Sequence, residues 1–235
     1  MKTQTSASNN YYFLILTVSF LFMCFSCKIK SKVPVIPKEK SIASNQSIVD
    51  SIIKDIDGNS YSTIQIGDQL WMQSNLRTTR YNNGKHITHA TINENLSNPN
   101  REGMVINDSL KNNYGSHYNF YAIIEGSLCP EGWHIPSNDE WLKMIDFFGG
   151  ECNLEFLSQF NTDINFYSEM GGIVIPENLL NHLSEYGETG YWWTSSNIGR
   201  NTATYYQLSK GDTCIHKSGA KENNFLSVRC VKDGP

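Results

Sequence analysis

The sequence lacks the charge pattern of proteins that bind nucleic acids. Its 19 Lys and Arg residues are outnumbered by 23 Asp and Glu residues, which gives a formal net charge of −4. No basic cluster is denser than Lys28-Ile29-Lys30-Ser31-Lys32. Because nucleic-acid binding needs a basic stripe that neutralises phosphates, we expect no nucleic-acid partner.

Motifs of common enzymes and metal sites are also missing. Beyond the N-terminal segment there is no Cys-x-x-Cys pair, so a zinc ribbon or a thioredoxin-like site has no basis. Neither Gly-x-Ser-x-Gly nor His-Glu-x-x-His occurs, which removes the usual signatures of α/β-hydrolases and zinc proteases. We therefore expect no catalytic residues, no metal site and no cofactor.

A long hydrophobic run is absent at the N-terminus, where only residues 11–25 are uncharged and mostly apolar. This run is broken by Thr17 and Ser19 and falls short of the roughly 20 apolar residues that a spanning helix needs. Small Ser26 directly precedes Cys27, which resembles the relaxed lipobox of bacterial lipoprotein signal peptides, whose cysteine is diacylated. We expect a signal peptide at residues 1–26 and lipidation at Cys27. The alternative is an uncleaved anchor helix.

The segment after Cys27 is rich in Lys, Pro, Ser and Asn, and it predicts a flexible linker over residues 27–47. Residues 48–235 then form the folded domain, held to a membrane by the N-terminal lipid. The predicted location is the cell envelope, as an outer-membrane lipoprotein that faces the surface or the periplasm.

Four cysteines remain once Cys24 and Cys27 are set aside. An even number in an exported protein favours disulfide bonds, and four cysteines allow three connectivities. The sequence by itself leaves open which pairs form. The four are Cys129, Cys152, Cys214 and Cys230.

Two tryptophans and the start of a helix lie together in residues 129–141. Ser137 is a favourable N-cap, and Glu140 three positions later completes a capping box. Apolar residues then recur at helical spacing until Gly149-Gly150. A short amphipathic helix is predicted from about Asn138 to Phe148.

The rest of the domain predicts short strands and turns. Periodicity and turn residues predict strands over 52–56, 61–66, 69–72, 203–208, 214–217 and 225–232, with a short helical insertion over 177–184. The fold class is therefore α+β, with many short antiparallel strands and one or two short helices.

Two features invite a metal hypothesis that the spacing does not support. Residues 55–59 resemble a calcium loop in composition, but the glycine stands at position four, where an EF-hand needs it at position six. His86 and His89 lack further ligands at a recognisable spacing. We interpret both features as turn and loop residues.

Several short sequence words occur together in a specific order. They are Asp57-Gly58-Asn59-x-Tyr61, Ile66-Gly67-x-Gln69-x-Trp71-Met72, Asn75-Leu76-Arg77, Tyr81-x-x-Gly84, Cys129-Pro130-x-Gly132-Trp133-His134-x-Pro136, Glu140-Trp141, Gly190-Tyr191-Trp192-Trp193-Thr194-Ser195-Ser196 and Ser227-Val228-Arg229-Cys230-Val231-Lys232. This set resembles the Fibrobacter succinogenes major paralogous domain, which is common in exported lipoproteins of the Bacteroidota.

The resemblance implies a fold similar to C-type lectins and to the formylglycine-generating sulfatase-modifying family. It also implies a disulfide bond between Cys129 and Cys230. Cys152 and Cys214 would then form a second pair or remain free thiols, and we favour the pair slightly.

For function, the resemblance implies a non-catalytic binding or adhesion module whose glycan or protein ligand is unknown. Core packing is favoured for the tryptophans, and Trp192 and Trp193 are only weak binding candidates, because adjacent strand residues face opposite ways and at least one could lie at the surface. The alternatives are a structural subunit of an outer-membrane assembly and a formylglycine-generating-type oxidoreductase, whose copper site needs a close cysteine pair. His134 with Glu131 and Asp139 can be posed as acid–base residues, but His134 suits a structural donor better.

Overall fold

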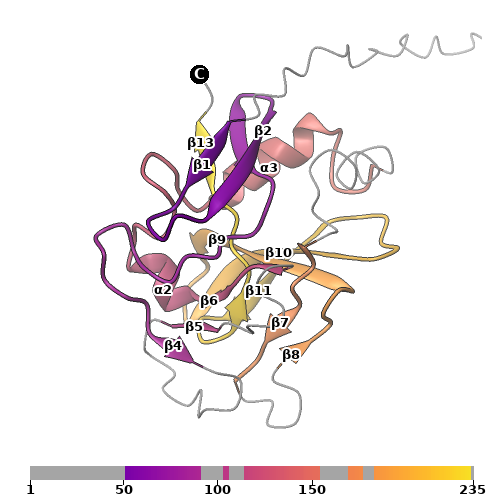
Figure 1. Cartoon of the computed structure of the whole chain (residues 1–235). Helices are drawn as coiled ribbons and strands as arrows, with labels where there is room; N and C mark the ends of the chain where they lie inside the picture. Colours follow the sequence, from indigo (N-terminus) through magenta and orange to yellow (C-terminus); the bar gives the residue numbers. More distant parts are fainter. Residues whose placement is uncertain (1–50, 91–102, 106–113, 154–168, 177–182, 234–235) are drawn as a thin grey trace, which may run out of the picture. The chain divides into compact units, whose positions relative to one another are not determined.

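A computed structural model describes residues 51–90, 103–105, 114–153, 169–176 and 183–233 (Figure 1). The expected signal peptide, Cys27 and the linker 27–47 lie outside these residues. The described elements are β1 (Ile52–Lys54), β2 (Ser60–Ile66), β3 (Gln69–Met72), β4 (His89–Ala90), β5 (Met104–Val105), β6 (His117–Asn119), α2 (Phe120–Ile124), α3 (Asn138–Phe147), β7 (Ile173–Val174), β8 (Leu183–Ser184), β9 (Thr189–Asn197), β10 (Thr202–Ser209), β11 (His216–Lys221), β12 (Phe225–Leu226) and β13 (Val231–Asp233).

The first sheet joins the start of the domain to its end. Its strand order is β1-β2-β3-β13, and all of its pairs are antiparallel. The last strand, β13, pairs with β3 so that Val231 lies opposite Trp71. Figure 1 shows β1, β2 and β13 at the same end of the domain, and in the sheet β3 lies between β2 and β13.

The second sheet, in the order β11-β10-β9, carries helix α3 on one face. The helix contributes Trp141, which stacks on Tyr206 of β10 with ring centroids 4.8 Å apart. The same indole meets Trp71 of β3 edge-on at 5.3 Å. This aromatic group forms the centre of one of two buried apolar clusters, which we call the helix cluster.

The third sheet has the order β4-β5-β6-β12-β7-β8 and is antiparallel apart from the β4–β5 pair. Helix α2 follows β6 directly, and the side chain of its N-cap residue Asn119 accepts a bond from the Ala122 N–H at 3.1 Å. Tyr118, Phe120 and Leu226 belong to the second apolar cluster, which we call the sheet cluster.

The structure confirms the coarse fold class, since mostly antiparallel strands are accompanied by two short helices in the described residues. The predicted helix is confirmed as α3, with both reciprocal bonds of the capping box present. No helix within the described ranges is long and apolar enough to cross a membrane.

Three predicted elements are wrong in part. Leu183–Ser184 is a strand that pairs with β7, whereas we predicted helix there; the remainder of that prediction lies outside the described residues. The partner of β10 begins at His216 rather than Cys214, because Cys214 is bonded to Cys152. Residues 225–232 form two short strands, because the chain crosses from the third sheet to the first between them.

Candidate functional site

The segment from Cys129 to Ile135 is held along most of its length. Cys129 is joined to Cys230 by a disulfide, the pair that the family resemblance implies. The Trp133 N–H donates to the Pro130 carbonyl at 2.9 Å, which closes a turn at Gly132. His134 exchanges two backbone bonds with Val231, at 2.9 and 2.8 Å. The segment is therefore fixed to the start of β13, by a disulfide to Cys230 and by hydrogen bonds to Val231.

The turn Tyr81–Gly84 also holds this segment in place. The Asn82 N–H donates to the Ser127 carbonyl at 2.9 Å, and the Asn82 side chain donates to the Cys129 carbonyl. The Tyr81–Gly84 turn thus fixes residues 127–129 through both backbone and side chain.

Glu140 connects the helix start to His134. Its Oε2 accepts bonds from the Ser137 N–H at 2.7 Å and hydroxyl at 2.8 Å, while Oε1 lies 2.5 Å from His134 Nε2. Partial burial acts to raise the pKa of Glu140, but the bonds from Ser137 and His134 together hold that pKa below its ordinary value. The His134 imidazole is therefore paired with Glu140, whose carboxylate has a structural role in the capping box. Among the described residues, Glu131 and Asp139, the partners in the acid–base hypothesis, form no hydrogen bond or ion pair with this imidazole.

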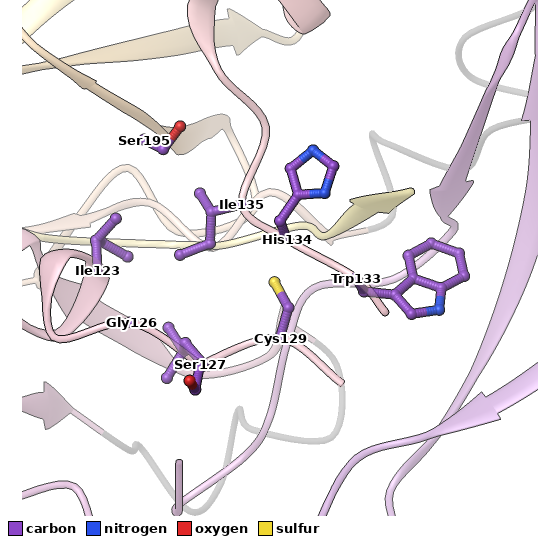
Figure 2. Close-up of a pocket in the computed structure, with 9 residues that line it drawn as sticks. Ile123, Gly126, Ser127, Cys129, Trp133, His134, Ile135 and Ser195 are labelled. Carbon is purple, nitrogen blue, oxygen red and sulfur yellow. The ribbon is translucent and has the colours of Figure 1, made fainter. Parts of the chain in front are cut away.

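A cavity of about 280 Å³ opens beside this segment (Figure 2). It lies between the end of α2, the Cys129–Ile135 segment and β9. Its lining residues are Ile123, Gly126, Ser127, Leu128, Cys129, Trp133, His134, Ile135 and Ser195. We call it the α2 pocket. Typical ligand sites have volumes of about 300 Å³ or more. The α2 pocket is at the lower limit of this range, so it suits one small group rather than an extended ligand.

The predicted binding candidates Trp192 and Trp193 are not at this site or at any surface. Both are 0% exposed. The two side chains do face opposite ways, as expected for a strand, but Trp192 enters the helix cluster and Trp193 the sheet cluster. Neither indole reaches the surface, because β9 lies between the two cores.

A buried polar group that the sequence did not indicate lies beneath β9. The side-chain oxygen of Asn75 accepts bonds from Trp192 Nε1 at 2.9 Å and Arg229 Nε at 3.1 Å. Its amide nitrogen donates to the Tyr114 and Glu169 carbonyls at 2.9 and 2.8 Å. Burial raises the pKa of the Glu169 carboxyl, which lies 3.9 Å from the Arg229 guanidinium, and lowers that of Arg229 to about 10. This arrangement serves the framework, since Asn75, Trp192 and Arg229 are all fully buried.

The calcium-like residues 55–59 also form framework. Asp55 accepts bonds from the Asp57 and Asn59 N–H groups at 3.0 and 2.9 Å and from the Tyr61 hydroxyl at 2.6 Å. Asp57 meets Arg80 Nε at 2.6 Å. These carboxylates are therefore occupied by turn and loop partners, as the interpretation of a turn requires.

Histidines 86 and 89 are both exposed. Within the part of the chain that the structure describes, no three His, Cys, Asp or Glu side chains come together as a metal site would require.

The second cysteine pair also forms a disulfide, between Cys152, five residues after the end of α3, and Cys214, before β11. Cys214 and Cys230 therefore belong to different bridges. The two bridges differ in environment, because Cys129 and Cys230 are buried whereas Cys152 is exposed and Cys214 half-buried.

His117 is a buried titratable residue outside the α2 pocket. Its Nε2 donates to the Gly171 carbonyl at 2.8 Å, and its ring lies 5.9 Å from that of Tyr186. Burial lowers the pKa of His117 to about 4, although the bonds to the Gly171 and Gly172 carbonyls act in the opposite direction. The imidazole is neutral at pH 7.

We expect His117 to make the domain acid-sensitive. Its folded pKa lies below the unfolded value of about 6.5, so the unfolded state binds the extra proton first and stability is lost as pH falls below that value. Between pH 6.5 and 5 the free energy of unfolding should fall with a slope approaching about 1.4 kcal/mol per pH unit. Urea unfolding followed by tryptophan fluorescence measures this slope.

His117→Gln keeps a donor near Gly171 but removes the titration, so its slope should be smaller by about one proton. His216→Gln changes an exposed histidine and is the matched control. An unchanged slope in His117→Gln would contradict the assignment.

The geometry places the sequence words in a single framework, and a comparison with known families identifies it. Residues 64–232 match the family model of the Fibrobacter succinogenes major domain. The chain belongs to this family. It matches no curated protein and no solved structure.

The words of the Fibrobacter succinogenes major domain meet one another in space. Asn75 of the Asn75-Leu76-Arg77 motif contacts Arg229 in the segment between β12 and β13. The Trp192 ring lies 2.0 Å from where a Cβ on Gly190 would be. Only glycine leaves room for that indole. The matched region begins within β2, yet the Asp57–Arg80 pair ties the preceding turn to the same framework.

Proposed function

We propose that this chain is an exported, lipid-anchored binding module of the cell envelope, and that it binds its ligand at the α2 pocket without catalysing a reaction. The proposal rests on the observation that residues 127–135 are rigidly held and also line the α2 pocket. The segment is fixed to the framework by a disulfide, two bonds to β13 and the Tyr81–Gly84 turn, and it also lines a cavity open to solvent. A site on so rigid a support is pre-organised for binding.

The cellular location rests on the sequence and on the cysteines. Ser26-Cys27 supplies the lipidation site, with the outer membrane as the site of attachment. Two disulfide bonds support export, because such bonds persist in the periplasm and on the cell surface but are rare in the cytosol.

The finer fold that we propose is that of a C-type-lectin-like domain. A disulfide joins the approach to α3 with Cys230, directly before the last strand, and that strand returns to pair with β3 of the first sheet. This closed framework supports loops on one scaffold, which suits recognition of a ligand.

Contacts in the structure favour binding over catalysis. The formylglycine-type reaction needs a close cysteine pair, but Cys214 and Cys230 lie in separate bridges. In the described residues the His134 side chain is bonded to Glu140 and forms no hydrogen bond with Ser127 or Ser195. The pocket thus lacks the nucleophile–base bond that acyl transfer requires.

The lipid anchor can be tested on protein from its native membrane. Intact mass should show a mature chain that begins at Cys27 with a diacyl modification, and Cys27→Ser should release the protein from the membrane fraction. An intact Met1 would contradict the lipoprotein assignment.

The binding role can be tested with the full chain in detergent micelles on glycan and peptide arrays. Ser195 is exposed on β9 at the pocket rim, so Ser195→Phe should fill the pocket without entering the core. Ser218→Phe makes the same change on exposed β11 of the same sheet and serves as control.

We expect Ser195→Phe to abolish array binding that Ser218→Phe retains. Tryptophan fluorescence checks that both variants are folded. If both variants bind as the parent does, or if the parent binds neither array, the α2 pocket is not a ligand site.

A further inference from the structure

The walls of the α2 pocket are aliphatic. Ile123, Leu128 and Ile135 are buried and line it together with the sulfur-bearing residue Cys129. Its polar side chains are two serines and His134, and the imidazole is already bonded to Glu140. A sugar ring brings a hydroxyl on nearly every carbon, and each buried hydroxyl without a partner costs free energy. The pocket therefore suits an apolar group better than a sugar.

The tryptophan of the pocket does not provide a stacking platform inside it. Figure 2 shows the Trp133 indole turned away from Ile123, Ile135 and Ser127. That side chain is half-buried and packs against the sheet cluster. Stacking of a sugar ring on Trp133 within the pocket is thus disfavoured.

Apolar surface continues from the pocket onto α2. Ile124, next to the lining residue Ile123, is 61% exposed, which is unusual for a large aliphatic side chain. An exposed isoleucine beside an aliphatic cavity is typical of a surface that docks another protein.

The segment that lines the pocket, residues 126–135, carries one carboxylate, Glu131. Glu125 pairs with Lys85 at 2.8 Å, and Glu140 pairs with His134. Glu131 is exposed on the turn between the lining residues Cys129 and Trp133 and forms no ion pair within the described ranges. The rim therefore favours a positive charge on the occupant.

We infer that the α2 pocket takes a single aliphatic side chain of a protein partner, with an adjacent Lys or Arg of that partner against Glu131. This inference rests on the proposed function and names its ligand class. The cavity of about 280 Å³ admits one side chain, and the aliphatic walls supply its apolar contacts. The exposed Glu131 adds a modest preference for a neighbouring cation.

Isoleucine methyl NMR of the full chain in micelles tests this directly, because Ile123 and Ile135 report on the pocket and buried Ile64 and Ile215 on the distant helix cluster. The probes are the blocked dipeptides acetyl-Leu-Lys-amide, acetyl-Ala-Lys-amide and acetyl-Leu-Glu-amide, together with the methyl glycosides of glucose, galactose and N-acetylglucosamine. We expect the Leu-Lys probe to shift Ile123 and Ile135 but not Ile64 or Ile215.

The side chain and the charge are tested separately. The Ala-Lys probe should bind about tenfold more weakly, because it loses most of the buried apolar area. Glu131→Gln should weaken the Leu-Lys probe about two- to fivefold and abolish its advantage over Leu-Glu. Asp68→Asn, which removes an exposed turn carboxylate elsewhere, should have no effect.

Each other outcome overturns a defined part. Glycosides that shift Ile123 and Ile135 while the peptides do not would overturn the ligand class but keep the pocket as a binding site. Equal binding of Leu-Lys and Leu-Glu in the parent would overturn the role of Glu131. Shifts from no probe would overturn the inference, and the array comparison of Ser195→Phe with its control would then decide the proposed function independently.

Discussion

Replacing Asn75 by alanine is expected to lower the free energy of unfolding by about 4 kcal/mol, because several buried groups lose their shared partner at once. The Asn75 side chain is 0% exposed. It accepts from Trp192 Nε1 and Arg229 Nε and donates to two carbonyls, those of Tyr114 and Glu169. Each buried donor or acceptor deprived of a partner costs about 1–3 kcal/mol, and more where a charge is involved.

This loss would be a large part of the total stability, which for a domain is usually about 5–15 kcal/mol. Urea unfolding followed by tryptophan fluorescence measures it. Asn83→Ala is the matched control, since Asn83 is exposed and accepts one local bond from the Lys85 N–H at 2.9 Å. A change below about 1 kcal/mol in Asn75→Ala would show that water or repacking replaces these bonds.

Close packing around Asn75 leaves little room for such repacking. Gly115 has a φ of +79°, and a Cβ there would lie 2.6 Å from Asn75 Cβ. A side chain at residue 115 would therefore be both strained and crowded. Asn75 is therefore confined by close packing against Gly115 and by the hydrogen bond from Arg229.

Local chemistry explains which parts of the fold are predictable from sequence. The capped helix α3 depends on Ser137, Glu140 and the glycines that follow Phe148, which all lie within fourteen residues of one another. The β2–β3 hairpin is set in the same way by Gly67 at its turn. Such elements are specified by residues that are neighbours in the chain, so they can be predicted directly from the sequence.

Long-range pairing explains most of what the sequence did not reveal. Asn75 and Arg229 are separated by 154 residues, and nothing in either word shows that it meets the other. The alternation of Trp192 and Trp193 was predictable, but the two cores that cover both faces of β9 were not. The α2 pocket likewise unites α2, residues 126–135 and Ser195, which only the tertiary fold brings together.

Removing the buried disulfide with Cys129→Ala and Cys230→Ala is expected to lower the free energy of unfolding by about 4 kcal/mol. The bridge spans 101 residues and encloses the Cys152–Cys214 bridge, which spans 62. While the inner bridge is intact, the shortest covalent path between Cys129 and Cys230 is only about 39 residues. In the chain-entropy model that shorter path reduces the contribution of the outer bridge from about 4.7 to about 4 kcal/mol.

The nesting makes the two bridges interdependent. Removing both should cost about 1 kcal/mol more than the two separate losses added together, because each bridge closes a longer loop when the other is absent. A four-member cycle of parent, Cys129→Ala/Cys230→Ala, Cys152→Ala/Cys214→Ala and the quadruple variant, unfolded in urea, measures this difference. Alanine avoids placing a hydroxyl at the buried positions 129 and 230. If the losses in free energy of unfolding are strictly additive, the bridges act mainly on the folded state. In the folded state the two bridges have separate local contacts, one at the α2 pocket and the other after α3, so their effects would be independent.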